Sequence, residues 1–263
     1  MPGIDFDELD ERGYTVLHGL VDTDALACFE TAIDAAARAQ AAKYDIPLTS
    51  AEPFIDVMKK GGPYRTLVFG LAKYLRVLHQ MCSGVNDRLE KDGFFDWSGQ
   101  TTPLFWSTLR ADLPGEDLYL LPMHQDFGSI RCEKSWRLWV PLRPVDADSG
   151  TMEVVVGSHR LGPLDYDFSD LKHTCVEASV YEGMATETIE LSAGQGVLIN
   201  SFIAHRSVPN QSDRVKYVLL VNLQDLATMV DPDYPEHEIA EFIRMAADRD
   251  ADRKIHLAER EVQ

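Results

Sequence analysis

The amino-acid sequence predicts a mainly β protein with flanking helices, whose strands form an antiparallel β-sandwich of the jelly-roll type. Three observations support this. From about residue 104 the chain breaks into short runs rich in β-branched and aromatic residues, and turn signals such as Pro114-Gly115 and Pro209-Asn210 separate most of them. Seven or eight strands at this spacing are typical of a sandwich. With 263 residues, 45% of them hydrophobic, the chain can bury a substantial core in one domain.

The strand-like runs follow a first short β segment at 13–17. They are expected at 104–112, 118–123, 135–142, 151–156, 186–191, 196–204 and 215–224. The less regular segment 161–184 lies between two of them. We expect it to be either a mobile lid over a site or an exposed acidic loop.

The first part of the chain, about 1–100, is expected to form a helical buttress. Asp22-Thr23-Asp24 supplies cap residues, and Leu26, Phe29 and Ile33 follow at helical spacing, which predicts an amphipathic helix to about Lys43. A second helix is expected over about 65–91, and a segment interrupted by proline and glycine, 45–64, lies between the two. The predicted domain thus comprises this buttress, a jelly-roll core over about 104–225 and a C-terminal helix over about 235–250.

The chain carries a formal net charge of −18, and its charges are spread without a basic stripe. This argues against a nucleic acid or an anionic membrane as a partner. The acidic N-terminus lacks the apolar region of a signal peptide, and no run reaches the roughly 18 apolar residues of a membrane span. Four cysteines lie far apart without a Cys-x-x-Cys pair, as expected for reduced thiols. We therefore expect a cytoplasmic protein; its oligomeric state is left open.

His124 and Asp126 lie two positions apart at the end of the expected strand 118–123. Side chains at i and i+2 of a strand point to the same face. A third ligand would complete the 2-His-1-carboxylate triad of non-haem Fe(II) oxygenases, which leaves coordination positions open for a co-substrate and O2. In an acidic chain with 8 histidines the pair alone is a weak signal, because a surface histidine beside an aspartate in a turn has the same pattern.

His205 follows the expected strand 196–204 and is the candidate third ligand. A turn through Pro209 and Asn210 leads to Arg214 and the next strand, so we expect His205 and Arg214 to flank one hairpin. A planar guanidinium there is suited to bind a carboxylate through two hydrogen bonds, with the Ser207 hydroxyl nearby. The alternative is a surface hairpin with a solvated Arg214 paired to Asp213, and geometry alone leaves both open.

Several motifs occur in an order that resembles a known family. They are Met123-His124-Gln125-Asp126, Leu138-Trp139-Val140-Pro141-Leu142, Ser149-Gly150-Thr151-Met152, Gly157-Ser158-His159-Arg160, and His205-x-Ser207-x-Pro209-Asn210 with Arg214. Together they resemble the phytanoyl-CoA dioxygenase-like branch of the Fe(II)/2-oxoglutarate oxygenases, over most of the chain. The resemblance implies a double-stranded β-helix (jelly-roll, cupin-like) core that uses Fe(II), 2-oxoglutarate and O2.

The resemblance also implies roles for individual residues. The iron ligands would be His124, Asp126 and His205. The co-substrate residues would be Arg214, at the distal carboxylate of 2-oxoglutarate, with Ser207, Trp139 and Thr108. We interpret His159 as structural. Two features depart from the family pattern: Val156 stands where many relatives have proline, and Arg214 follows His205 by only nine positions. Candidate substrate residues, suggested only by their positions, are Gln125, Phe127, Arg131 and Arg137.

The implied reaction is hydroxylation of an unactivated C–H bond of a small-molecule metabolite, with release of succinate and CO2. Related halogenases lack the carboxylate ligand, so the presence of Asp126 favours oxygen transfer. The alternatives are desaturation, cyclisation or epoxidation by the same iron chemistry, and a non-catalytic binding module on the same sandwich. A zinc hydrolase is disfavoured because no general-base carboxylate stands in a recognisable motif beside the ligands.

Overall fold

The computed structural model describes residues 3–60, 74–116, 120–130, 132–164, 166–167 and 175–230. Its centre is a five-stranded antiparallel sheet in the order β1-β8-β3-β10-β2. These strands are β1 (Tyr14–Leu17), β8 (Gly196–Asn200), β3 (Ser135–Pro141), β10 (Lys216–Asp225) and β2 (Pro103–Asp112). A three-stranded sheet, β7-β4-β9, is formed by β7 (Thr186–Ile189), β4 (Met152–Val155) and β9 (His205–Ser207). The short strands β5 (Tyr166–Asp167) and β6 (Cys175–Val176) pair with each other.

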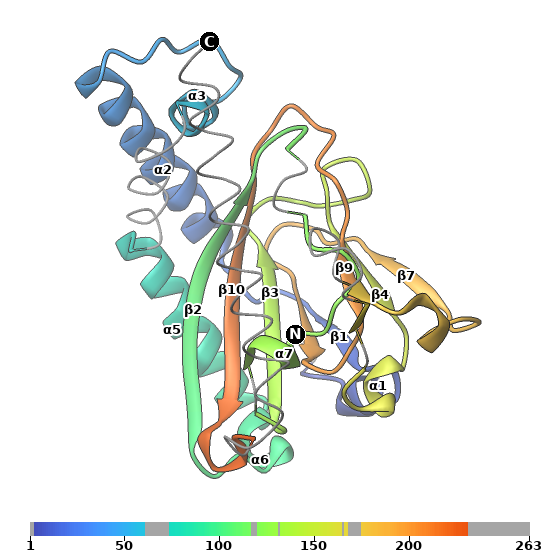
Figure 1. The fold of residues 1–263 in the computed structure, drawn as a ribbon. Coiled ribbons are helices and arrows are strands. Elements are labelled where there is room, and N and C mark those ends of the chain that lie inside the picture. The colour runs from blue at the N-terminus through green and yellow to red at the C-terminus, as the bar shows by residue number, and fades with distance from the viewer. Residues whose placement is uncertain are drawn as a thin grey trace.

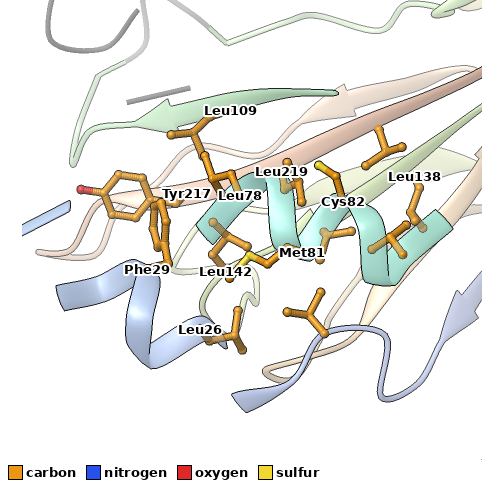
Figure 2. Close-up of a cluster of buried hydrophobic side chains, with 14 of the residues drawn as sticks. Leu26, Phe29, Leu78, Met81, Cys82, Leu109, Leu138, Leu142, Tyr217 and Leu219 are labelled. Carbon is orange, nitrogen blue, oxygen red and sulfur yellow. The ribbon is translucent and has the colours of Figure 1, made fainter. Parts of the chain in front are cut away.

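The five-stranded sheet separates two hydrophobic cores. On one side lie α2 (Thr23–Lys43), α3 (Pro53–Lys59), α5 (Arg76–Lys91) and α6 (Phe94–Ser98), and on the other lie β4, β7 and β9 (Figure 1). Figure 2 shows the helix side, where side chains of α2 and α5 pack against Leu109, Tyr217 and Leu219 of the sheet. On the other side Trp139 and Val218 pack against Val154 of the smaller sheet. The expected mainly β fold with flanking helices is confirmed. Within the described residues, the five-stranded and three-stranded sheets remain separate and do not close into a barrel.

The predicted helix after Asp22 is confirmed as α2, whose first turn is capped by the Asp22 carboxylate, which accepts a hydrogen bond from the Asp24 N–H at 2.7 Å. The described part of the second predicted helix begins at Arg76; residues 65–73 and the predicted C-terminal helix at 235–250 lie outside the described residues. Three further helices were not predicted: α1 (Phe6–Arg12), α3 and α6. α3 begins at Pro53. Proline suits the first turn of a helix, because the backbone N–H that it lacks would have no partner within the helix there. No helix in the described ranges is long and apolar enough to cross a membrane.

Two expectations about the strands are wrong. Residues 120–123 are not in a strand, and only an isolated bridge pairs His124 with His205. The predicted strand 196–204 ends at Asn200, and β9 then begins at His205 in the other sheet. The segments before and after the turn at 208–215 therefore belong to different sheets and do not form a hairpin.

The turn at 208–215 is organised by a buried side chain, Asn210. Its amide donates to the backbone carbonyls of Arg214 at 2.8 Å and Asp112 at 3.2 Å, and its carbonyl oxygen accepts from the Ser212 backbone at 3.1 Å. The amide thus replaces the backbone pairing that a hairpin would supply. Gly150, with φ of 81°, lies so close to Asn210 that a Cβ would meet its backbone at 2.9 Å. This packing directs the chain from one sheet to the other.

The carboxylate of Asp225, at the end of β10, is expected to stabilise the fold. Its fully buried carboxylate accepts hydrogen bonds from the backbone N–H groups of Thr101 at 3.0 Å and Thr102 at 2.9 Å. Burial raises its pKa, but these bonds outweigh burial and hold the pKa well below its ordinary value. A depressed pKa contributes stability above the unfolded value of about 4, and that contribution is lost as the pH falls below it. We expect Asp225→Asn to lower the unfolding free energy by about 2 kcal/mol at neutral pH, and the deficit to shrink below about pH 4.

Urea denaturation of wild type and Asp225→Asn, at pH 7 and at about pH 3.5, measures this effect. The same change at the exposed Asp213 is the control and should have little effect at either pH. A deficit for Asp225→Asn that stays constant with pH would contradict the explanation.

Candidate metal centre

Three candidate ligand side chains converge between the sheets. One ligand atom from each of His124, Asp126 and His205 lies within 4.8 Å of the other two. The two histidines are backbone partners, each N–H donating to the other's carbonyl at 2.9 Å. Asp126 lies in the turn before the short helix α7 (Phe127–Ile130), and its carbonyl accepts from the Ile130 N–H at 3.1 Å. The convergence therefore comes from a bridge and a turn, and not from the alternation of one strand.

Both imidazoles present the same nitrogen to the centre. Nδ1 of His124 lies 2.8 Å from the Pro122 carbonyl oxygen, and Nδ1 of His205 lies 3.1 Å from that of Ile203. A carbonyl oxygen only accepts, so Nδ1 carries the proton and each Nε2 keeps its lone pair. Each Nε2 lies 3.8 Å from an oxygen of Asp126. Nε2 of His124 is buried and has no hydrogen-bond partner among the described residues, as expected of an atom that binds a metal.

The protonation states also suit a metal. Burial, and then the neighbouring His205, lowers the pKa of His124 to about 3, and burial likewise lowers the pKa of His205. Burial alone would raise the pKa of Asp126, but the neighbouring charges, of which Arg137 has the largest effect, together outweigh burial and lower that pKa. Two neutral imidazoles and one carboxylate are the forms that bind a divalent cation.

The candidate substrate residues have other partners. Arg137, on β3, donates to Oδ1 of Asp126 at 2.5 Å and to Oδ1 of Asn222 at 3.0 Å. Gln125 is buried, and its amide bonds the carbonyls of Gly162 at 2.9 Å and Phe202 at 2.5 Å. Both residues thus hold the centre and its surrounding loops together, and a contact with substrate stays a prediction for them. Phe127 is buried and stacks on Phe202 with ring centroids 4.3 Å apart; Arg131 lies outside the described residues.

Arg214 is not brought to the centre, and the expectation for it is corrected. Its side chain is 60% exposed, and Nε lies 3.5 Å from Glu52, at the start of α3. It lines a cavity of about 150 Å³ together with Tyr217, which faces the helices. The cause is the corner at Asn210, which carries Arg214 to the helix side of the five-stranded sheet.

Two other cations lie on the inner side of the sheet. Arg110 on β2 and Lys216 on β10 each contact the buried carboxylate of Asp112 at 2.8 Å. Nη2 of Arg110 also donates to Oγ of Ser207 at 3.2 Å, and Ser207 lies two residues after His205 on β9. The donor groups of Arg110 and Lys216, which we call the Arg110–Asp112–Lys216 cluster together with Asp112, are of the kind that bind a carboxylate group. The sequence signal that was missed is Lys216 itself, a charged residue at an inward-facing position of an apolar strand.

Trp139 and Thr108 also lie on the inner face of the sheet. Trp139 is buried between the two sheets and pairs with Leu220 and Val197. Thr108 pairs with Leu220 from the other side, two residues before Arg110. Both remain predicted to line a co-substrate pocket. His159 lies away from the triad, where its Nε2 is 3.1 Å from the Asp10 carbonyl, as a structural role requires.

The candidate lid, 161–184, is described only in part, since residues 165 and 168–174 lie outside the described ranges. Val176 is buried, its N–H donates to the Met123 carbonyl at 2.8 Å, and it packs with Leu164 and Ala204. These parts of the segment are therefore packed beside the candidate ligands His124 and His205. Whether the segment closes over a site stays a prediction.

Two hydroxylases from Streptomyces are similar to part of this chain. The 1-deoxypentalenic acid 11-beta-hydroxylase of Streptomyces arenae is 31% identical over 105 residues, and that of Streptomyces exfoliatus is 30% identical over 105 residues. Each match covers 37% of this chain and only 37% of the relative's length.

Among solved structures, the non-heme alpha ketoglutarate dependent carbocyclase SnoK of nogalamycin biosynthesis has a TM-score of 0.51 at 20% identity, over 83% of this chain and 82% of its own. The non-heme monooxygenase ThoJ has a TM-score of 0.54 at 15% identity, over 96% of this chain and 98% of its own. These likenesses show a shared fold. The family model for phytanoyl-CoA dioxygenase (PhyH) matches residues 9–218, and the chain therefore belongs to the phytanoyl-CoA dioxygenase family.

Proposed function

We propose that the protein is an Fe(II)/2-oxoglutarate-dependent oxygenase that hydroxylates an unactivated C–H bond of a small-molecule metabolite. The observation that carries the proposal is the convergence of His124, Asp126 and His205, with both Nε2 atoms facing one carboxylate. When bound, Fe(II) and 2-oxoglutarate supply the chemistry, in which O2 is activated and succinate and CO2 are released. The family membership and the partial match to two hydroxylases support this choice.

The chain's own residues bind and orient the groups. In this proposal the three ligands fix Fe(II), and Arg110 and Lys216 bind the distal carboxylate of 2-oxoglutarate, assisted by Ser207. Two residues along a strand span about 6.6 Å, so β9 separates His205 from Ser207 by roughly the length of a five-carbon diacid. The packed side chains of the inner face, Trp139 among them, exclude water from the space between the sheets.

The presence of Asp126 favours oxygen transfer over halogenation, as the sequence suggested. Cyclisation, desaturation or epoxidation by the same centre is the second candidate, and the carbocyclase among the structural neighbours is the observation that favours it. We also propose a cytoplasmic location, supported by three free cysteines among the described residues, Cys28, Cys82 and Cys132.

The direct test is a turnover assay with the purified full-length chain. With Fe(II), 2-oxoglutarate and O2 we expect slow succinate formation without substrate, and faster, coupled formation when a library of terpenoid and other natural-product acids contains the substrate. Product mass then separates the outcomes: hydroxylation adds one oxygen atom, whereas desaturation removes two hydrogens. Absence of any Fe(II)-dependent succinate would overturn the proposal.

A further inference from the structure

We propose that Arg137 is a positioning residue that keeps Asp126 a one-oxygen ligand of the metal, and that Asn222 holds Arg137 in place. This inference rests on the proposed function, because it concerns the ligand set for Fe(II). It gives a role to an ion pair that metal binding alone does not require, since His124, His205 and one carboxylate oxygen already complete the triad.

The guanidinium of Arg137 is fixed from two sides. Nη1 donates to Oδ1 of Asp126 at 2.5 Å, and Nε donates to Oδ1 of Asn222 at 3.0 Å. Asn222 is fully buried and lies directly opposite Arg137 in the ladder between β10 and β3. Since both donors belong to one rigid plane, the two bonds together determine where the guanidinium lies. The side chains of Arg137 and Asp126 are only 15% and 3% exposed, so water competes little for the contact.

The hydrogen bond from Arg137 makes the two carboxylate oxygens of Asp126 inequivalent. Oδ1 accepts a charge-assisted hydrogen bond from Arg137, which draws electron density from it and occupies one of its lone pairs. Oδ1 lies 3.8 Å from Nε2 of His124 and Oδ2 lies 3.8 Å from Nε2 of His205, so the histidines face both oxygens equally and the bond from Arg137 makes the difference between them. We therefore assign Oδ2 to the metal. Outer hydrogen bonds of this kind commonly orient a ligating carboxylate.

The number of ligands makes this orientation important. An octahedral Fe(II) with three protein ligands has three positions left, and chelating 2-oxoglutarate together with O2 requires all three. A carboxylate that bound through both oxygens would take one of them. Arg137 thus determines how many positions remain for the co-substrate, without itself touching the metal or the substrate.

The test compares Arg137→Met with wild type, using Co(II) as a spectroscopic probe in the full-length apo-protein. We expect the Co(II) affinity, measured by calorimetry, to fall roughly ten- to hundredfold. We also expect the visible spectrum of the bound Co(II) to change, and the affinity of the Co(II)-loaded protein for 2-oxoglutarate to fall. Arg137→Lys keeps the charge and should restore part of the metal affinity. Arg206→Met is the matched control, because Arg206 pairs with Glu153 at 2.9 Å and its side chain is 53% exposed.

A merely structural role would lower the thermal midpoint of Arg137→Met and leave Co(II) affinity and spectrum unchanged when both are measured well below that midpoint; this result would overturn the proposal. Asn222→Leu is the second variant, in case Arg137→Met does not fold. It keeps the number and branching of the side-chain heavy atoms and removes the acceptor, and it should weaken Co(II) binding several-fold; wild-type affinity in that variant would equally count against the network. Failure of the proposed function is a different result, in which the wild-type chain itself neither binds Co(II) nor forms succinate.

Discussion

Replacing His124 by alanine is expected to abolish Fe(II)-dependent succinate formation, coupled and uncoupled alike. The substitution removes one of two neutral imidazole donors and leaves a cavity beside the anionic Asp126. With one histidine and one carboxylate left, metal affinity should fall by at least about a hundredfold, since a lost ligand costs more than a lost outer contact. Succinate release and Co(II) calorimetry on the same preparation measure both effects.

The fold should survive this change. Nε2 of His124 has no partner within the described part of the chain, and the ring's Nδ1 bonds only a carbonyl two residues away. The backbone pairing with His205 does not depend on the side chain. His159→Ala is the control: it loses a contact to the Asp10 carbonyl and some stability, but should keep wild-type metal affinity. Turnover in His124→Ala at a wild-type rate would exclude the proposed centre.

The convergence of the candidate ligands could be predicted from the sequence because residue type and order carry the information. A histidine and an aspartate two positions apart, with a second histidine near a strand end, keep their meaning whatever the local backbone does. The reason given for their convergence was nevertheless wrong, since Asp126 lies in a turn and His124 in an isolated bridge. Motif spacing thus predicted the centre better than strand periodicity did.

Arg214 shows what the sequence could not determine. Polar residues between two apolar runs predict a turn, but they do not say whether the two strands share a sheet. That depends on long-range packing, here of Asn210 against Asp112 and of Gly150 against Asn210. A similar limit applies to Arg137, whose charge suggested a substrate contact. Its observed partner, Asp126, lies in the turn before α7, and the packing of that turn against β3 cannot be read from residue types alone.

Lys216→Met should raise the KM for 2-oxoglutarate by at least about tenfold, whereas Arg214→Met should leave it within about twofold. Truncating one member of a buried charge pair costs roughly 2–5 kcal/mol, but the unpaired distal carboxylate keeps Arg110 and Ser207, so the lower part of that range applies. Lys216 is 5% exposed and points inward; Arg214 is largely exposed and pairs with Glu52. Initial-rate kinetics of succinate formation at varied 2-oxoglutarate measure both constants.

Lys216→Met and Arg214→Met test two alternative positions for the group that binds the distal carboxylate of 2-oxoglutarate. Lys216→Met also leaves the buried Asp112 with one cation fewer, which costs stability, so the kinetics are read well below the thermal midpoint of each variant. Lys216→Arg keeps the charge and should retain most of the affinity for 2-oxoglutarate. A raised KM in Arg214→Met with an unchanged KM in Lys216→Met would return the carboxylate site to the position that the sequence suggested. The expected result instead assigns it to the inner face of the sheet, because only a cation on that face shares the space between the sheets with the metal ligands.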